Sequence, residues 1–153
     1  MLFLLFQLDQ DRYALDASQV AEVLPLVGVK RIPQAPAGVV GVFDRHGAPV
    51  PLIDLSQLAL GRPAESRLST RIIIVRYPDD GGHRRLLGLI AEKATETMRR
   101  ERADFVDSGI RSDGAAYLGP VAADARGLVQ WVEVSKLLTG PVRDALFREP
   151  VGH

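Results

Sequence analysis

Histidine is the side chain that most often performs acid–base catalysis or binds a metal, and this chain of 153 residues has three, His46, His83 and His153. His46 and His83 fall in expected turns and His153 is the last residue, so they do not share a helical face as paired zinc ligands do. Cysteine is absent, which excludes disulfides, thiolate nucleophiles and Cys-ligated zinc. We therefore expect no metal site and no cofactor, and we expect His83 and His153 to be plain solvated residues.

The carboxylates are scattered over expected turns, as at Asp9 with Asp11 and at Asp79 with Asp80. Turn carboxylates are normally solvated, whereas general acid–base catalysis needs a carboxylate in a desolvated cleft. The chain also lacks a G-x-S-x-G elbow, a P-loop and a dinucleotide fingerprint. The sequence thus predicts no catalytic residue and no enzyme, and a small hydrolase with an unrecognised site is the least favoured alternative.

The charge balance and the hydropathy limit the classes of partner. Lys plus Arg and Asp plus Glu are each 19, so the formal net charge is zero, which argues against nucleic-acid binding and against a polybasic membrane surface. The N-terminal apolar run, Met1 to Phe6, is too short for a signal peptide, and no stretch reaches the ~18 apolar residues of a spanning helix. We predict a soluble, cytoplasmic protein with no direct membrane insertion and no nucleic-acid partner.

The elements that must position any functional side chain are short strands. The 14 glycines and 10 prolines are spread along the chain between short apolar runs, which is typical of many strands joined by turns. We predict a mainly β protein with barrel-like closure. The expected strands cover residues 2–8, 12–16, 29–32, 39–43, 50–53, 71–77, 86–92, 95–98, 117–123 and 127–132.

Helices are expected to be few and short. Asp16 can cap a helix over 17–24, in which Val20, Val23 and Leu24 share one face, and this face is more often core than interface. Asp54 can cap a helical turn through Leu58. A helix is expected over 134–138, and residues 140–153 are expected to form a short helix or a tail. Loops are expected over 61–69 and 99–116.

The region from residue 33 to residue 55 differs from the rest because it carries a recognisable motif. It reads PQAPAGVVGVFDRHGAPVPLIDL. Two prolines three residues apart, a glycine in the next strand, a polar tip at residues 44–47 and a strand ending in Asp-Leu resemble the CheW-like domain. Residues 3–13, 20–24, 71–75, 87–92, 117–119, 128–132 and 136–138 are similar to further segments of that family, in the same order.

The resemblance implies a fold and a function. The fold is two five-stranded SH3-like β-barrels that share an apolar core, here as one domain over 1–153. The function is a non-enzymatic adaptor in a cytoplasmic chemosensory array, linking the tip of a methyl-accepting chemoreceptor to the regulatory domain of a CheA-type histidine kinase. The residues at the family's receptor- and kinase-contact positions are Val20, Glu22, Gly41, Asp44, Arg45 and His46.

The chain departs from the family pattern at two positions, and one alternative function stays open. The family arginine of the tip is His46 here, so Arg45 is the candidate to replace it, and Glu92 stands where the family has aspartate. These differences suggest a divergent member, for example of a surface-sensing (Wsp-like) system. Gly41 has a purely structural alternative, the close approach of two strands. The alternative function is a small-ligand or peptide-binding β-barrel outside chemotaxis.

Overall fold

The computed structural model describes residues 1–36, 38–78, 84–110 and 113–147. Of the turn expected over residues 78–82, residues 79–82 lie outside the described residues, as do His83 and His153, which are expected to be solvated.

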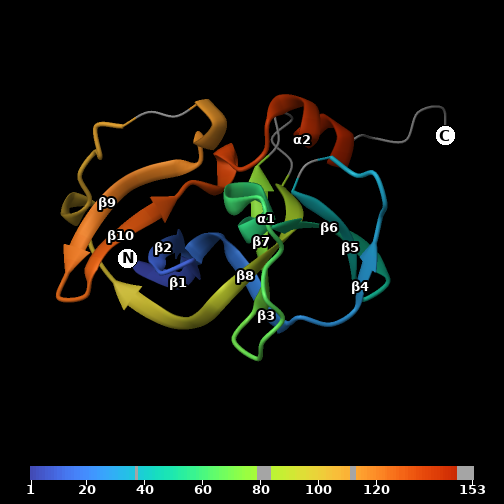
Figure 1. Ribbon diagram of the computed structural model, residues 1–153, viewed down its shortest axis with the longest axis horizontal. Helices are drawn as coiled ribbons and strands as arrows, with labels where there is room; N and C mark the ends of the chain where they lie inside the picture. Colours follow the sequence, from blue (N-terminus) through green and yellow to red (C-terminus); the bar gives the residue numbers. More distant parts are fainter. Residues whose placement is uncertain (37, 79–83, 111–112, 148–153) are drawn as a thin grey trace.

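Ten strands form one sheet that runs through the molecule (Figure 1). The path of paired strands is β4-β5-β6-β8-β1-β2-β10-β9, and β7 joins it by pairing with β8 and β3. The sheet stays open among the described residues, yet its mainly β character is as predicted. The strands are β1 (Leu2–Leu8), β2 (Asp11–Asp16), β3 (Val20–Pro25), β4 (Val29–Arg31), β5 (Val39–Arg45), β6 (Ala48–Asp54), β7 (Arg71–Pro78), β8 (Arg84–Arg99), β9 (Leu118–Asp124) and β10 (Gly127–Val132).

The 16-residue strand β8 connects the two halves of the sheet. Its first part pairs with β7 and β6, and its last part pairs with β1. Two separate strands were expected over 86–92 and 95–98, and that expectation is wrong. The pairing with β1 is irregular between Leu5 and Gln7, and Lys93 has a positive φ of 51°, so one bulged strand looks like two in the sequence.

The core has three apolar clusters because the central strands bury both faces. In β7, Ile72 and Ile74 face one cluster, while Ile73, Val75 and Tyr77 face another. The central cluster takes side chains from both halves of the sheet, and the two outer clusters each belong to one half. The central cluster includes Leu4, Phe6, Leu15, Ile53, Ile73, Val75, Tyr77, Leu87, Leu89, Val132, Val134 and Leu137.

The expected helix over 17–24 is wrong. Asp16 does act as a cap, because its Oδ1 accepts a hydrogen bond from the Ser18 N–H at 3.0 Å, but only the 3-10 turn η1 (Ala17–Gln19) follows. The segment then continues as β3, with an irregular register against β7 between Val20 and Glu22. Because the extra residue shifts the alternation of side chains, Val20 and Val23 pack on the same cluster and imitate a helical spacing.

The other helices are short. Helix α1 (Leu55–Leu60) is capped by Asp54, as expected, and ends at Gly61, which has a φ of 75°. The loop expected over 99–116 contains the 3-10 turns η2 (Arg102–Asp104) and η3 (Asp113–Ala115), and the helix expected over 134–138 is the 3-10 turn η4 (Val134–Lys136). Helix α2 (Gly140–Leu146) follows, with Thr139 as its N-cap. In the described chain, none of the helices has the length and apolarity needed to cross a bilayer.

Candidate interaction surface

The polar tip joins β5 to β6 through a two-residue turn. Arg45 pairs with Ala48, so His46 and Gly47 form the turn, with φ values of 52° and 86°. Two successive positive φ angles are the signature of the type I′ turn that matches the twist of a hairpin. The Oδ1 of Asp44 accepts a hydrogen bond from the Gly47 N–H at 2.8 Å, so this carboxylate fastens the turn. Asp44 and His46 are both exposed.

The guanidinium of Arg45 reaches from the end of β5 to β3. Its Nε donates a hydrogen bond to the Oε2 of Glu22 at 3.1 Å. The two side chains are 32% and 35% exposed, so the ion pair is accessible from solvent. Among the described strands β3 and β5 do not pair, and this contact therefore links two elements that the backbone leaves separate. An accessible ion pair of this kind stabilises a fold by at most about 1 kcal/mol.

Val20 sits at the start of β3, where the backbone is held by an arginine of β7. The Nη1 of Arg76 lies 3.2 Å from the carbonyl oxygens of both Ser18 and Val20 and donates to them. The half-buried side chain of Val20 packs on the central cluster, in line with the core interpretation. Arg76 was not among the predicted site residues, although a single charge between the buried residues 72–75 and the buried Tyr77 indicates a side chain with a specific partner.

Gly41 has a structural reason to be glycine. It is buried in β5 and pairs with Arg31 of β4. A Cβ at this position would overlap the carbonyl oxygen of Lys30, which is backbone and cannot rotate away. Gly41 therefore allows the close approach of β4 and does not join the exposed group around Arg45.

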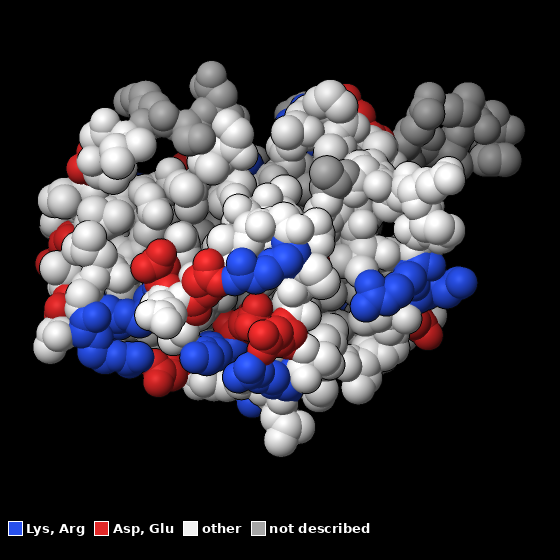
Figure 2. All heavy atoms as spheres, in the orientation of Figure 1, with Lys and Arg blue, Asp and Glu red and all other residues white. Residues whose placement is uncertain are grey.

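The structure thus assembles part of the predicted site. It joins Glu22 to Arg45, places the exposed tip residues Asp44 and His46 beside Arg45 in the chain, and leaves Gly41 inside the sheet. On the face drawn in Figure 2, acidic and basic side chains lie next to one another in the middle, and a group of basic side chains lies apart on the right. The mixture in the middle fits a partner of mixed charge better than a polyanion.

Two cavities on the described part of the chain do not include Arg45. A cavity of about 770 Å³ lies beside β9, and one of about 410 Å³ lies between β4, β5 and α1, and none of the six predicted site residues lines either one. No group of three His, Cys, Asp or Glu residues in the described chain could hold a metal ion. Every buried side-chain nitrogen or oxygen of the described residues has a hydrogen-bond partner. Glu22, Asp44, Arg45 and His46 therefore form an accessible group of polar side chains that lines neither of these cavities.

Comparison with known proteins gives three findings. The family model for the CheW-like domain matches residues 2–141. The chemotaxis protein CheW of Helicobacter pylori is 31% identical over 104 residues, which are 67% of this chain and 59% of that protein, so the chain spans less than two thirds of this relative. The crystal structure of the scaffolding protein TtCheW from Thermoanaerobacter tengcongensis superposes with a TM-score of 0.78 at 22% identity, covering 92% of this chain and 89% of that one.

Proposed function

Because the chain belongs to the CheW-like domain family, we propose that it is a non-enzymatic adaptor that couples the cytoplasmic tip of a methyl-accepting chemoreceptor to the regulatory domain of a CheA-type histidine kinase. Its place would be the cytoplasmic side of a receptor array. The names of the relatives, a chemotaxis protein and a scaffolding protein, support this role. They do not favour the alternative of a small-ligand or peptide-binding barrel outside chemotaxis. A Wsp-like setting stays a prediction.

The observation that carries the proposal is the accessible ion pair between Glu22 and Arg45. It brings two of the predicted contact positions, 23 residues apart in the chain, to one point on the surface. Arg45 stays the candidate to replace the family arginine, since its guanidinium is accessible beside β3 while the family position of the tip arginine holds His46. We assign the partner contact to Glu22, Arg45 and the tip residues Asp44 and His46, with Val20 at its apolar border.

The first prediction concerns Arg45. Replacing Arg45 with alanine should weaken binding of the receptor tip or of the kinase regulatory domain by about 1–3 kcal/mol, roughly fivefold to more than a hundredfold, because a charged hydrogen-bonding group is lost from the contact. The melting temperature should stay nearly unchanged, since the ion pair is accessible to water. Titration calorimetry with each purified partner measures the effect, and the unaltered chain should bind in the micromolar range, about −8 kcal/mol.

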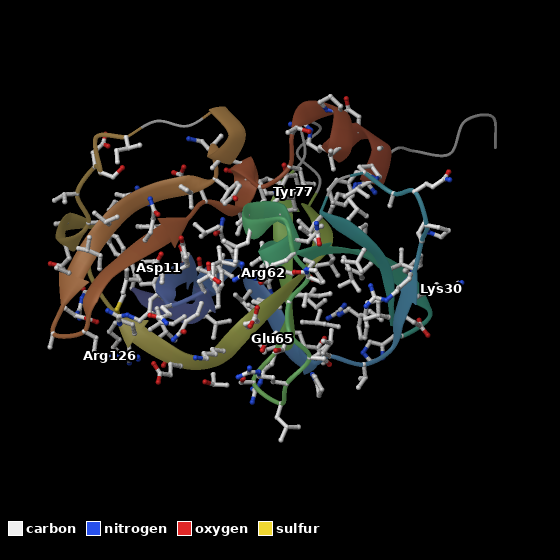
Figure 3. The ribbon with its side chains drawn as sticks, in the orientation of Figure 1. Asp11, Lys30, Arg62, Glu65, Tyr77 and Arg126 are labelled. Atoms are coloured by element: carbon white, nitrogen blue, oxygen red, sulfur yellow. The ribbon has the colours of Figure 1, made fainter. Side chains whose placement is uncertain are left out.

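A matched control for Arg45 lies at the other end of the molecule. Arg126 also donates to a glutamate, Glu96, at 3.1 Å, and both side chains are exposed. Figure 3 labels Arg126 at the lower left, whereas Figure 1 shows β5, which carries Arg45, on the right. Arg126→Ala should leave both affinities unchanged. If the unaltered chain binds none of the histidine kinases of its own organism, the adaptor proposal is wrong. If it binds but Arg45→Ala and Arg126→Ala are alike, the adaptor stands and the contact lies elsewhere.

A further inference from the structure

Helix α2 rests on the central cluster through one apolar face. Val142 and Leu146, and Phe147 just after the helix, pack against that cluster. The ring of Phe147 stacks on Tyr77, with ring centroids 5.5 Å apart and an interplanar angle of 30°. Tyr77 itself has no exposed surface, and Figure 3 shows it beneath α2. The helix and Phe147 therefore cover a mainly apolar part of the core, in which the hydroxyl of Tyr77 donates to the carbonyl oxygen of Ser135 at 3.2 Å.

This cover is held weakly. None of the seven residues of α2 is buried, whereas α1, which has six residues, buries Leu55 and Ser56. A helix of this length is not stable alone in water, so α2 can be helical only while it is docked. Its N-terminus is fixed by a long hydrogen bond, 3.4 Å from the Val142 N–H to Thr139 Oγ1. An element with so little buried surface opens locally, without unfolding of the sheet.

The strand beneath α2 is also the strand that pairs with β3, which carries Val20 and Glu22. Val75 and Tyr77 alternate with Arg76 in β7, so they share the core-facing side of the strand. Val75 is the pairing partner of Val20, which borders the Glu22–Arg45 contact. Movement of α2 away from Tyr77 would thus expose apolar surface two residues along β7 from Val75, the pairing partner of Val20.

We propose that α2 is a displaceable cover, and that an amphipathic helix of the receptor tip takes its place on Tyr77 when the receptor binds. The proposal rests on the proposed function. The occupant is inferred from the surface itself, which already accepts an amphipathic helix whose apolar residues, Val142 and Leu146, are four positions apart. The segment matched by the family model ends at residue 141, within α2.

Two substitutions at one exposed position test the cover without touching the surface beneath it. Thr139→Ala removes the N-cap and should raise the affinity for a receptor-tip helical hairpin, up to about fivefold, because it increases the open fraction. Thr139→Asp strengthens the cap and should lower the affinity about twofold. Phe147→Ala, which removes the stacking on Tyr77, should act like Thr139→Ala with a larger effect. The control is Asp144→Asn on the solvent side of the helix, where the carboxylate is 79% exposed.

Hydrogen exchange tests the cover without any partner. The amides of α2 should exchange much faster than those of β7, and Thr139→Ala should accelerate α2 alone. The proposal is overturned if α2 is as protected as β7, or if Thr139→Ala and Phe147→Ala weaken binding of the hairpin, since α2 would then be part of the site. Failure of every variant and of the unaltered chain to bind the hairpin contradicts the proposed function instead, while the exchange rates still decide whether α2 opens.

Discussion

Replacing Ile74 with alanine is expected to lower the free energy of unfolding by about 2–5 kcal/mol, which is a large part of the 5–15 kcal/mol typical of a domain. Ile74 has no exposed surface and lies in β7, where it pairs with Glu22 of β3 on one side and with Gly88 of β8 on the other. Loss of its side chain removes apolar surface from a closed cluster and leaves a cavity that strands paired on both sides cannot fill. The cluster consists of Val50, Leu52, Ile72, Ile74 and Ile90.

Urea denaturation measures the loss of unfolding free energy in Ile74→Ala. Ile110→Ala is the matched control, because the same atoms are removed from a side chain that is 81% exposed, and it should change the stability by less than about 0.5 kcal/mol. An Ile74→Ala protein that melts within a degree of the unaltered chain would show that β7 is placed wrongly.

The strand β7 also shows what the sequence can predict. Four successive β-branched residues, 72–75, predict a strand buried on both faces, and each of them is fully buried. Local chemistry predicts the capping role of Asp54 and the hairpin around residues 44–47 equally well, because a cap and a turn depend only on neighbouring residues. The family resemblance then predicted the fold in which these elements are arranged.

The errors arose where the backbone departs from regular geometry. The extra residue in β3 between Val20 and Glu22 gave a strand the side-chain spacing of a helix, and the bulge near Lys93 made one strand look like two. Single-sequence periodicity assumes an uninterrupted element, so it has no means of detecting a residue that shifts the phase.

The sequence could predict which residues belong to the candidate site, but not which of them are in contact. The resemblance named Glu22 and Arg45 separately, but their contact depends on how β3 and β5 are carried by the sheet. The stacking of Phe147 on Tyr77 joins residues still farther apart in the chain. Contacts of this kind are products of tertiary packing, for which residue type and spacing carry no signal.

A third long-range contact, the ion pair of Arg12 with Asp124, connects the first hairpin to the last one. Arg12 of β2 is only 7% exposed, and its Nη1 and Nη2 donate to the two carboxylate oxygens of Asp124 at 2.9 and 2.5 Å. The Arg126 N–H also donates to Oδ1 at 2.8 Å. The hydrogen bond from Arg12 is the main reason that the pKa of Asp124 falls to about 2, against the opposing effect of burial.

Asp124→Asn is expected to destabilise the protein by about 2–4 kcal/mol at pH 7, because it leaves the buried guanidinium of Arg12 without its counter-charge. Glu96→Gln, which removes a charge from an exposed pair, should cost less than about 1 kcal/mol. Asparagine keeps a side-chain oxygen for the Arg126 N–H, so the difference reports mainly on the charge.

The pH dependence of the stability difference between the unaltered chain and Asp124→Asn shows whether the charge of Asp124 causes it. The folded-state pKa of Asp124, about 2, lies below its ordinary 3.8, so the folded state binds the proton less tightly than the unfolded chain does. The stabilisation by the charged carboxylate is therefore complete above about pH 5 and is lost as the pH falls from about 4 to about 2; its size is about 2 kcal/mol. Urea denaturation of both proteins at pH 7, 4 and 2.5 should show the gap between them narrowing as the carboxylate of the unaltered chain takes up its proton. A gap that stays constant over this range would mean that Asp124 acts through its shape and its hydrogen bonds, and that its charge contributes nothing to joining the hairpins.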